Sequence, residues 1–85
     1  MSCSLSTHVL DTSVGRPAAG VPVELRRDDG RVRLADELEP GTYALVFTPP
    51  SPFFRRIELT VELEDGHYHV PLLVSPYGCA SYRGS

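Results

Sequence analysis

HYHVPLLVSPYGCASYRGS, residues 67–85, contains the clearest strand pattern of the chain and decides the fold class. Side chains of a pleated strand point alternately to its two faces, so residues two apart share a face. One face of residues 67–74 carries a tyrosine followed by three apolar side chains, whereas the other begins with His67 and His69. The stretch therefore predicts a strand that buries one face and presents histidines on the other. A turn at residues 75–78 and a second strand follow it.

The same period of two recurs upstream and predicts an all-β chain. Alternation of apolar and polar residues indicates further strands at residues 4–12, 21–27, 31–34 and 54–64. Residues 43–48 are apolar on both faces, which predicts a central strand packed on both sides. Two Asp-Gly pairs favour hairpin turns, and three prolines between residues 49 and 52 exclude regular structure there. No ten-residue segment shows a period of 3.6, so little or no helix is expected. About seven short strands separated by turns predict an antiparallel β-sandwich.

The composition is that of a small globular protein. Its 85 residues, 41% of them hydrophobic, predict a single domain spanning residues 1–85. The net charge is −3 and the eight basic residues are scattered arginines, which argues against nucleic acid or a membrane as partner. The first residues lack the features of a signal peptide, and no apolar run could span a bilayer. Cys3 and Cys79, read as reduced thiols, indicate a cytoplasmic location; Cys79 is expected to be a small apolar filler.

Four motifs carry a resemblance to a known family. YHVPLLVSPYG followed by SYRGS resembles the C-terminal signature of the 5-hydroxyisourate hydrolases, the transthyretin-related enzymes of urate breakdown. LSTHVLDTSVGRPAAGVPVEL, residues 5–25, is similar to the N-terminal signature of that family. DGRV at residues 29–32 and PGTYALVF at residues 40–47 follow in the family's order. The resemblance implies a transthyretin-like (prealbumin-like) sandwich.

The chain departs from the family pattern in three places. Family members have another strand, often with a tryptophan, before the DGR segment, whereas this chain has no tryptophan and runs directly into Asp-Asp-Gly. They also carry a short helix after the LVF strand, where this chain has Pro-Pro-Ser-Pro. One edge strand and one helix are therefore expected to be missing. Cys79 and Ala80 replace the family's Tyr-Ser, and this leaves the identity of the substrate open.

The resemblance also implies a site and an activity. Matched by motif, the catalytic residues are His8, Arg31 and His69, and the substrate-binding residues are Tyr82, Arg83, Gly84 and Ser85. The implied reaction is hydrolysis of the cyclic amide bond of 5-hydroxyisourate to give 2-oxo-4-hydroxy-4-carboxy-5-ureidoimidazoline. No cofactor is implied. Relatives place their sites at subunit interfaces, so a homotetramer built as a dimer of dimers is expected.

The residue types suit this chemistry. Histidine titrates near neutrality and can take a proton from water, while arginine offers a planar fork of donors to an anionic ring or an oxyanion. No serine or cysteine lies in a nucleophile motif, which favours direct attack by water over a covalent intermediate. His67 and His69 share a strand face as a metal pair would, but no third ligand has a suitable spacing, so no metal is expected.

Two other functions remain open at this point. The missing segments and the Cys79-Ala80 pair are compatible with an enzyme that acts on another cyclic amide or purine-like metabolite. The segments from residue 15 to residue 47 also resemble prealbumin-like repeats of surface proteins, which would make the chain a binding module without catalysis. Such modules need neither the histidines nor the YRGS sequence, so catalysis is the preferred prediction.

Overall fold

The computed structural model describes residues 2–27, 30–33 and 37–84. Within these ranges it contains strands and no helix. The predicted turn residues Asp28 and Asp29, the end of the predicted strand at residue 34, and Ser85 lie outside the described residues. The strands are β1 (Cys3–Ser6), β2 (Val9–Asp11), β3 (Arg16–Pro17), β4 (Val23–Arg27), β5 (Gly30–Val32), β6 (Gly41–Phe47), β7 (Ile57–Leu63), β8 (Gly66–His69), β9 (Leu72–Ser75) and β10 (Gly78–Ser81).

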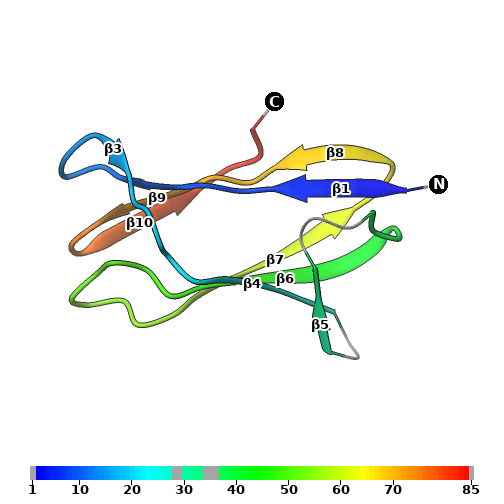
Figure 1. The fold of residues 1–85 in the computed structure, drawn as a ribbon, viewed down its shortest axis with the longest axis horizontal. Coiled ribbons are helices and arrows are strands. Elements are labelled where there is room, and N and C mark those ends of the chain that lie inside the picture. Colours follow the sequence, from blue (N-terminus) through cyan, green and yellow to red (C-terminus); the bar gives the residue numbers. More distant parts are fainter. Residues whose placement is uncertain (1, 28–29, 34–36, 85) are drawn as a thin grey trace.

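The strands form the two layers of a sandwich (Figure 1). One layer contains the pair β1–β8 and the sheet β10–β9–β2–β3, and the other contains the sheet β5–β4–β6–β7. The predicted strand at residues 4–12 corresponds to β1 and β2, and the strand at residues 67–74 corresponds to β8 and β9. Both are interrupted at the same level, where the second strand contains Pro71, a residue with no backbone N–H to donate. These interruptions add two strands to the seven predicted. The third additional strand is β3, which lies in the segment at residues 15–20 that was expected to be a loop and pairs with β2 over two residues.

The first layer is not antiparallel throughout, which corrects the sequence-based prediction. β1 pairs with β8, and β2 pairs with β9, in parallel. Two hydrogen bonds continue the ladder across the interruption: the Val70 N–H donates to the Ser6 carbonyl, and the Leu72 N–H donates to the His8 carbonyl, each at 2.9 Å. The first and last parts of the chain therefore form one continuous pair of strands. Period-two patterning defines the faces of a strand but carries no information on the direction of its partner.

The second layer follows the predicted alternation closely. β6, predicted to be apolar on both faces and central, lies between β4 and β7. On β7, Ile57 and Leu63 are buried, whereas Glu58, Thr60 and Glu62 are exposed. Between the layers lies one hydrophobic core, formed by Cys3, Leu5, Val9, Leu25, Leu38, Tyr43, Leu45, Phe47, Ile57, Leu63, Val70, Leu72 and Val74.

A proline-rich loop replaces the helix that family members carry. Ser51 ties this loop down: its hydroxyl donates to the Pro76 carbonyl at 2.7 Å and accepts from the N–H groups of Phe53 and Phe54 at 3.1 and 3.0 Å. The loop therefore packs against the β9–β10 turn without any helical hydrogen bonding. The described residues contain no helix at this point, as the sequence predicts.

Candidate functional site

Two histidines from opposite ends of the chain meet on the outer face of the first layer. In the parallel β1–β8 pair, Ser6 lies opposite His69. His8 lies two residues beyond Ser6 and therefore shares its face. Nδ1 of His8 lies 3.0 Å from Nε2 of His69, and the two rings stack with their centroids 5.0 Å apart. His8 is exposed and His69 is half-buried. The structure thus brings two of the three predicted catalytic residues into contact.

Serines and a third histidine extend this contact along the strands. The Ser6 hydroxyl lies 2.8 Å from Nδ1 of His69 and 3.1 Å from Nε2 of His67. The Ser4 hydroxyl lies 2.6 Å from Nδ1 of His67. Ser4, Ser6 and His67 are not among the site residues predicted from the motifs. The sequence shows that each lies an even number of residues from a predicted site histidine and so on the same face of its strand. It does not show the parallel register that brings the two strands together.

Gly84 contacts His69 from the segment that follows β10. Its N–H donates to the His69 carbonyl at 2.6 Å, in an isolated bridge. A Cβ atom at position 84 would lie 2.9 Å from Cδ2 of the His69 ring and 3.2 Å from the His69 carbonyl oxygen. Real Cβ atoms essentially never approach another heavy atom within 3.0 Å. Residue 84 therefore has to be glycine for the imidazole to keep its position.

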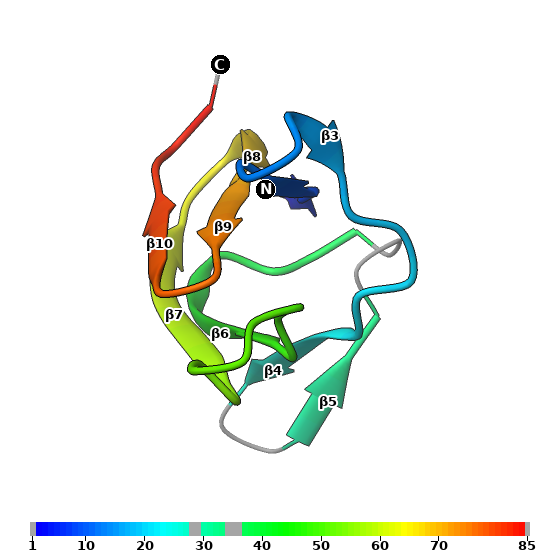
Figure 2. The ribbon, with the colours of Figure 1, turned by 90° about the vertical axis from the view of Figure 1, so that its left-hand side faces the viewer.

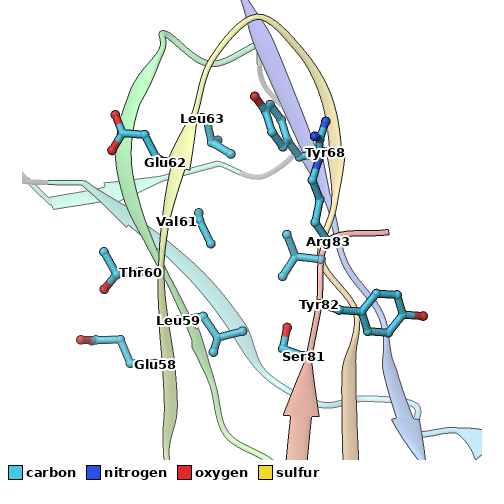
Figure 3. Close-up of a pocket in the computed structure, with 11 residues that line it drawn as sticks. Glu58, Leu59, Thr60, Val61, Glu62, Leu63, Tyr68, Ser81, Tyr82 and Arg83 are labelled. Carbon is cyan, nitrogen blue, oxygen red and sulfur yellow. The ribbon is translucent and has the colours of Figure 1, made fainter. Parts of the chain in front are cut away.

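The preceding residues of the YRGS sequence line a groove on the other side of the layer (Figure 3). The groove has a volume of about 440 Å³ and lies between β7 and the segment at residues 81–83. Leu59, Val61 and Leu63 point into it, and the Arg83 guanidinium lies 4.3 Å from the centre of the Tyr68 ring. Tyr82 is 59% exposed. Of the predicted substrate-binding residues, Gly84 thus contacts the histidines, Tyr82 and Arg83 line the groove, and Ser85 lies outside the described residues.

Arg31 is not brought to the histidines. It lies on β5, at the edge of the second layer, while His8 and His69 lie in the first (Figure 2). Its Nε donates to Glu24 Oε1 at 2.9 Å. This hydrogen bond holds the pKa of Glu24 below its usual value and raises the pKa of Arg31. The side chain is 78% exposed, so its described role is a surface ion pair, which contributes little to stability.

The two cysteines are free and differ in their surroundings. Cys3 is buried, and burial raises the pKa of its thiol, with a smaller contribution from Asp65. Cys79, which the sequence analysis interpreted as an apolar filler, is exposed on β10. That interpretation is wrong because the other layer does not cover the side chains of β10: Cys79, Ala80 and Ser81 are all exposed.

The arrangement can move protons between nitrogen and oxygen atoms. Within the ranges that the structure describes, no three His, Cys, Asp or Glu side chains come together as metal ligands. The same residues contain no helix long and apolar enough to cross a membrane. What the site offers is a pair of imidazoles in contact, one of which has a ring nitrogen open to solvent, and this is a suitable base for activating water.

Comparison with known proteins supports the resemblance drawn from the motifs. A family model described as "HIUase/Transthyretin family" matches residues 5–84. The 5-hydroxyisourate hydrolase of Caulobacter vibrioides is 41% identical over 112 aligned positions, which cover 95% of this chain and 97% of that protein. The structure of Klebsiella pneumoniae 5-hydroxyisourate hydrolase matches with a TM-score of 0.81 and 33% identity, covering 98% of this chain and 99% of that one.

A more distant match concerns the fold alone. Sea bream transthyretin, solved in complex with thyroxine, is 21% identical, with a TM-score of 0.72 over 96% of this chain and 95% of that one. The transthyretin-like sandwich predicted from the sequence is therefore confirmed. The alignment with the Caulobacter protein is longer than the 85 residues of this chain, which agrees with the predicted loss of segments. The chain belongs to the HIUase/Transthyretin family.

Proposed function

We propose that this protein hydrolyses the cyclic amide bond of 5-hydroxyisourate, giving 2-oxo-4-hydroxy-4-carboxy-5-ureidoimidazoline in urate degradation. The activity named for the Caulobacter and Klebsiella relatives supports this proposal. The single observation that carries it to this chain is the contact of His8 with His69, 3.0 Å apart on an open face of the sandwich. A binding module would not need two imidazoles in contact, so catalysis is the better explanation of this geometry.

In the proposed mechanism, water attacks the amide carbon directly. His8, whose Nε2 makes no contact with His69, removes one proton from the attacking water, and a tetrahedral oxyanion forms. When the C–N bond breaks, the same imidazole returns a proton to the leaving ring nitrogen. The product carboxylic acid then ionises. We assign His69 the role of holding the His8 ring, and Gly84 the role of holding His69.

The segment Tyr82 to Ser85 is proposed to bind substrate, with Gly84 against the histidine pair and Tyr82 and Arg83 lining the groove. Support comes from the bridge between Gly84 and His69, which attaches this segment to the histidine pair. Arg31 is the one predicted catalytic residue that this proposal leaves out, because it is ion-paired to Glu24 in the other layer. A cytoplasmic location is also proposed, supported by the two free thiols.

A homotetramer, arranged as a dimer of dimers, completes the proposal. In the part of the chain that the structure describes, β7 pairs only with β6 and β10 only with β9, so each has an open edge. The groove between them presents the half-buried side chains of Leu59 and Val61. Open edges and exposed apolar surface favour association, particularly in a chain this small.

The histidine pair can be tested by substitution. We expect His8→Asn and His69→Asn to leave the fold intact and to lower turnover of freshly generated 5-hydroxyisourate by roughly two to four orders of magnitude, the usual contribution of a proton-transfer group. Substrate depletion followed by ultraviolet absorbance measures this effect, and circular dichroism checks the fold. Wild-type turnover in both variants would contradict the site assignment, and an inactive wild-type protein would contradict the proposed substrate.

Arg31 provides a separate test of the geometry. Arg31→Lys keeps the charge and removes the guanidinium fork. Because the guanidinium is exposed and paired with Glu24, we expect turnover to stay within about threefold of wild type, as for the loss of a surface ion pair. Steady-state kinetics at saturating substrate gives the answer. A fall of about 100-fold, typical of a lost oxyanion donor, would return Arg31 to the site as the sequence resemblance implies.

Gly84 is expected to control the position of His69. In Gly84→Ala the new methyl group would lie 2.9 Å from the imidazole, so the ring has to move. We expect turnover to fall by about tenfold to 100-fold with an unchanged melting temperature, since a 1 Å displacement of a catalytic group costs about this much. Gly78→Ala is the matched control, because its methyl group would meet only the rotatable Ser75 hydroxyl, at 3.1 Å. Equal activity of the two variants would remove Gly84 from the site.

The assembly can be measured directly. We expect light scattering behind a sizing column to give about four times the 9.3 kDa mass of one chain, because two edges of the sandwich are open. Val61→Arg, which places a charge in the groove, should shift the mass to a smaller species. Val14→Arg makes the same substitution at an exposed residue that does not line the groove and serves as the control. A 9.3 kDa monomer of the wild-type protein at micromolar concentration would contradict the tetramer.

A further inference from the structure

Five side chains on the outer face of the first layer form an unbroken chain of hydrogen-bond distances. In order they are His8, His69, Ser6, His67 and Ser4, and the four separations are 3.0, 2.8, 3.1 and 2.6 Å. His69 and His67 each use both ring nitrogens, one toward each neighbour, and the Ser6 hydroxyl contacts both histidines. The mechanism above uses only His8 and His69, which leaves Ser6, His67 and Ser4 without an assigned role.

Counting protons shows that this chain has two ordered states. A neutral imidazole has one N–H and one acceptor nitrogen, and a serine hydroxyl has one proton to donate. If Nδ1 of His8 carries its proton and donates to His69, then His69 donates to Ser6, Ser6 to His67, and His67 to Ser4. If every proton moves one step along the chain, the direction of each hydrogen bond is reversed, so that each donor becomes the acceptor. The three histidines therefore carry their protons on Nδ1 in one state and on Nε2 in the other.

The two states differ in what His8 offers to a substrate. In the first state, Nε2 of His8 has a free lone pair and acts as a base. In the second, the same atom carries a proton and acts as an acid. A shift along the chain converts one state into the other, with one proton leaving or entering at the end formed by His67 and Ser4. His67 is exposed, so that end can exchange protons with water.

We infer that Ser6 and His67 are a proton relay for His8, and this inference rests on the proposed function. When water attacks the amide carbon, its proton binds Nε2 of His8 while one proton leaves to solvent at His67. When the C–N bond breaks, His8 gives that Nε2 proton to the leaving nitrogen and one proton enters at His67. The chain is then restored, and the net release of one proton comes from the product carboxylic acid.

The relay also keeps the histidine pair neutral. The rings of His8 and His69 stack with their centroids 5.0 Å apart. If His8 had to store the proton itself, the pair would carry an imidazolium through each turnover. Because the relay passes the proton on as it arrives, neither ring has to become charged. Ser6 is the essential link, since its hydroxyl lies between two histidines.

Kinetics with chemical rescue tests this role. We expect His67→Ala to lower kcat by about 10- to 100-fold, at or below the low end of the range for directly acting proton-transfer groups, with KM unchanged. Added imidazole should restore kcat in this variant and have no effect on wild type. Ser6→Ala should lose as much, the double variant should be no worse than either single one, and Ser6→Thr should keep activity because it keeps the hydroxyl. Ser13→Ala, which removes an exposed serine bonded to Asp11, is the control.

Two outcomes of these experiments would overturn the relay. The first is a His67→Ala variant that matches wild type in dilute buffer or that imidazole does not rescue. The second is a covalent acyl-enzyme on Ser6, detected by mass spectrometry, because it would make that serine a nucleophile.

Nitrogen NMR tests the relay without any substrate and so separates it from the proposed function. At a pH where the histidines are neutral, we expect His8, His67 and His69 of the full chain to share one tautomer. Ser6→Ala should leave His8 and His69 coupled and release His67 to its own preference. A mixed pattern in wild type, such as Nδ1–H on His69 with Nε2–H on His67, would overturn the relay. A protein that shows the shared tautomer but no hydrolysis would keep the relay and contradict only the proposed substrate.

Discussion

The parallel pairing of the first and last strands is the interaction on which the rest of this structure depends. Hydrogen bonds from Val70 to Ser6 and from Leu72 to His8 carry the ladder across the point where both strands are interrupted. The Thr7 hydroxyl reinforces it by donating to the Val70 carbonyl. Residues about 60 positions apart are thereby fixed side by side. Without this register the two histidines would share no surface.

The same pairing serves the core and the site through opposite faces. The inner face buries side chains such as Leu5, Val9 and Val70, and removing this apolar surface from water stabilises the fold. The outer face carries hydroxyls and imidazoles that contact one another rather than the core. The rigid inner packing therefore holds in place a polar array that has no packing of its own. Gly84 adds a second constraint, because its lack of a side chain lets the backbone lie against His69.

The shortened middle of the chain explains the position of Arg31. β4 pairs with β5 in a hairpin in which Arg27 lies opposite Gly30. With only two residues between these positions, β5 has to return along β4, and it remains in the second layer. Arg31 therefore lies away from the histidines to which the motif assigns it.

The sequence by itself determined the fold class, the positions of most strands and which face of the regular strands is buried. These follow from local rules: period-two alternation on β7 and β8, Asp-Gly pairs, and prolines that exclude helix. It also determined, through motifs near both ends, that His8, His69 and Gly84 belong together. The tertiary structure decided what depends on pairing between distant segments: the parallel direction of β1 and β2, the separation of Arg31, the exposure of Cys79 and the contacts of Ser6 with two histidines. The physical reason is that alternation defines the two faces of a strand, whereas its neighbour, direction and register are set by the packing of the whole sandwich.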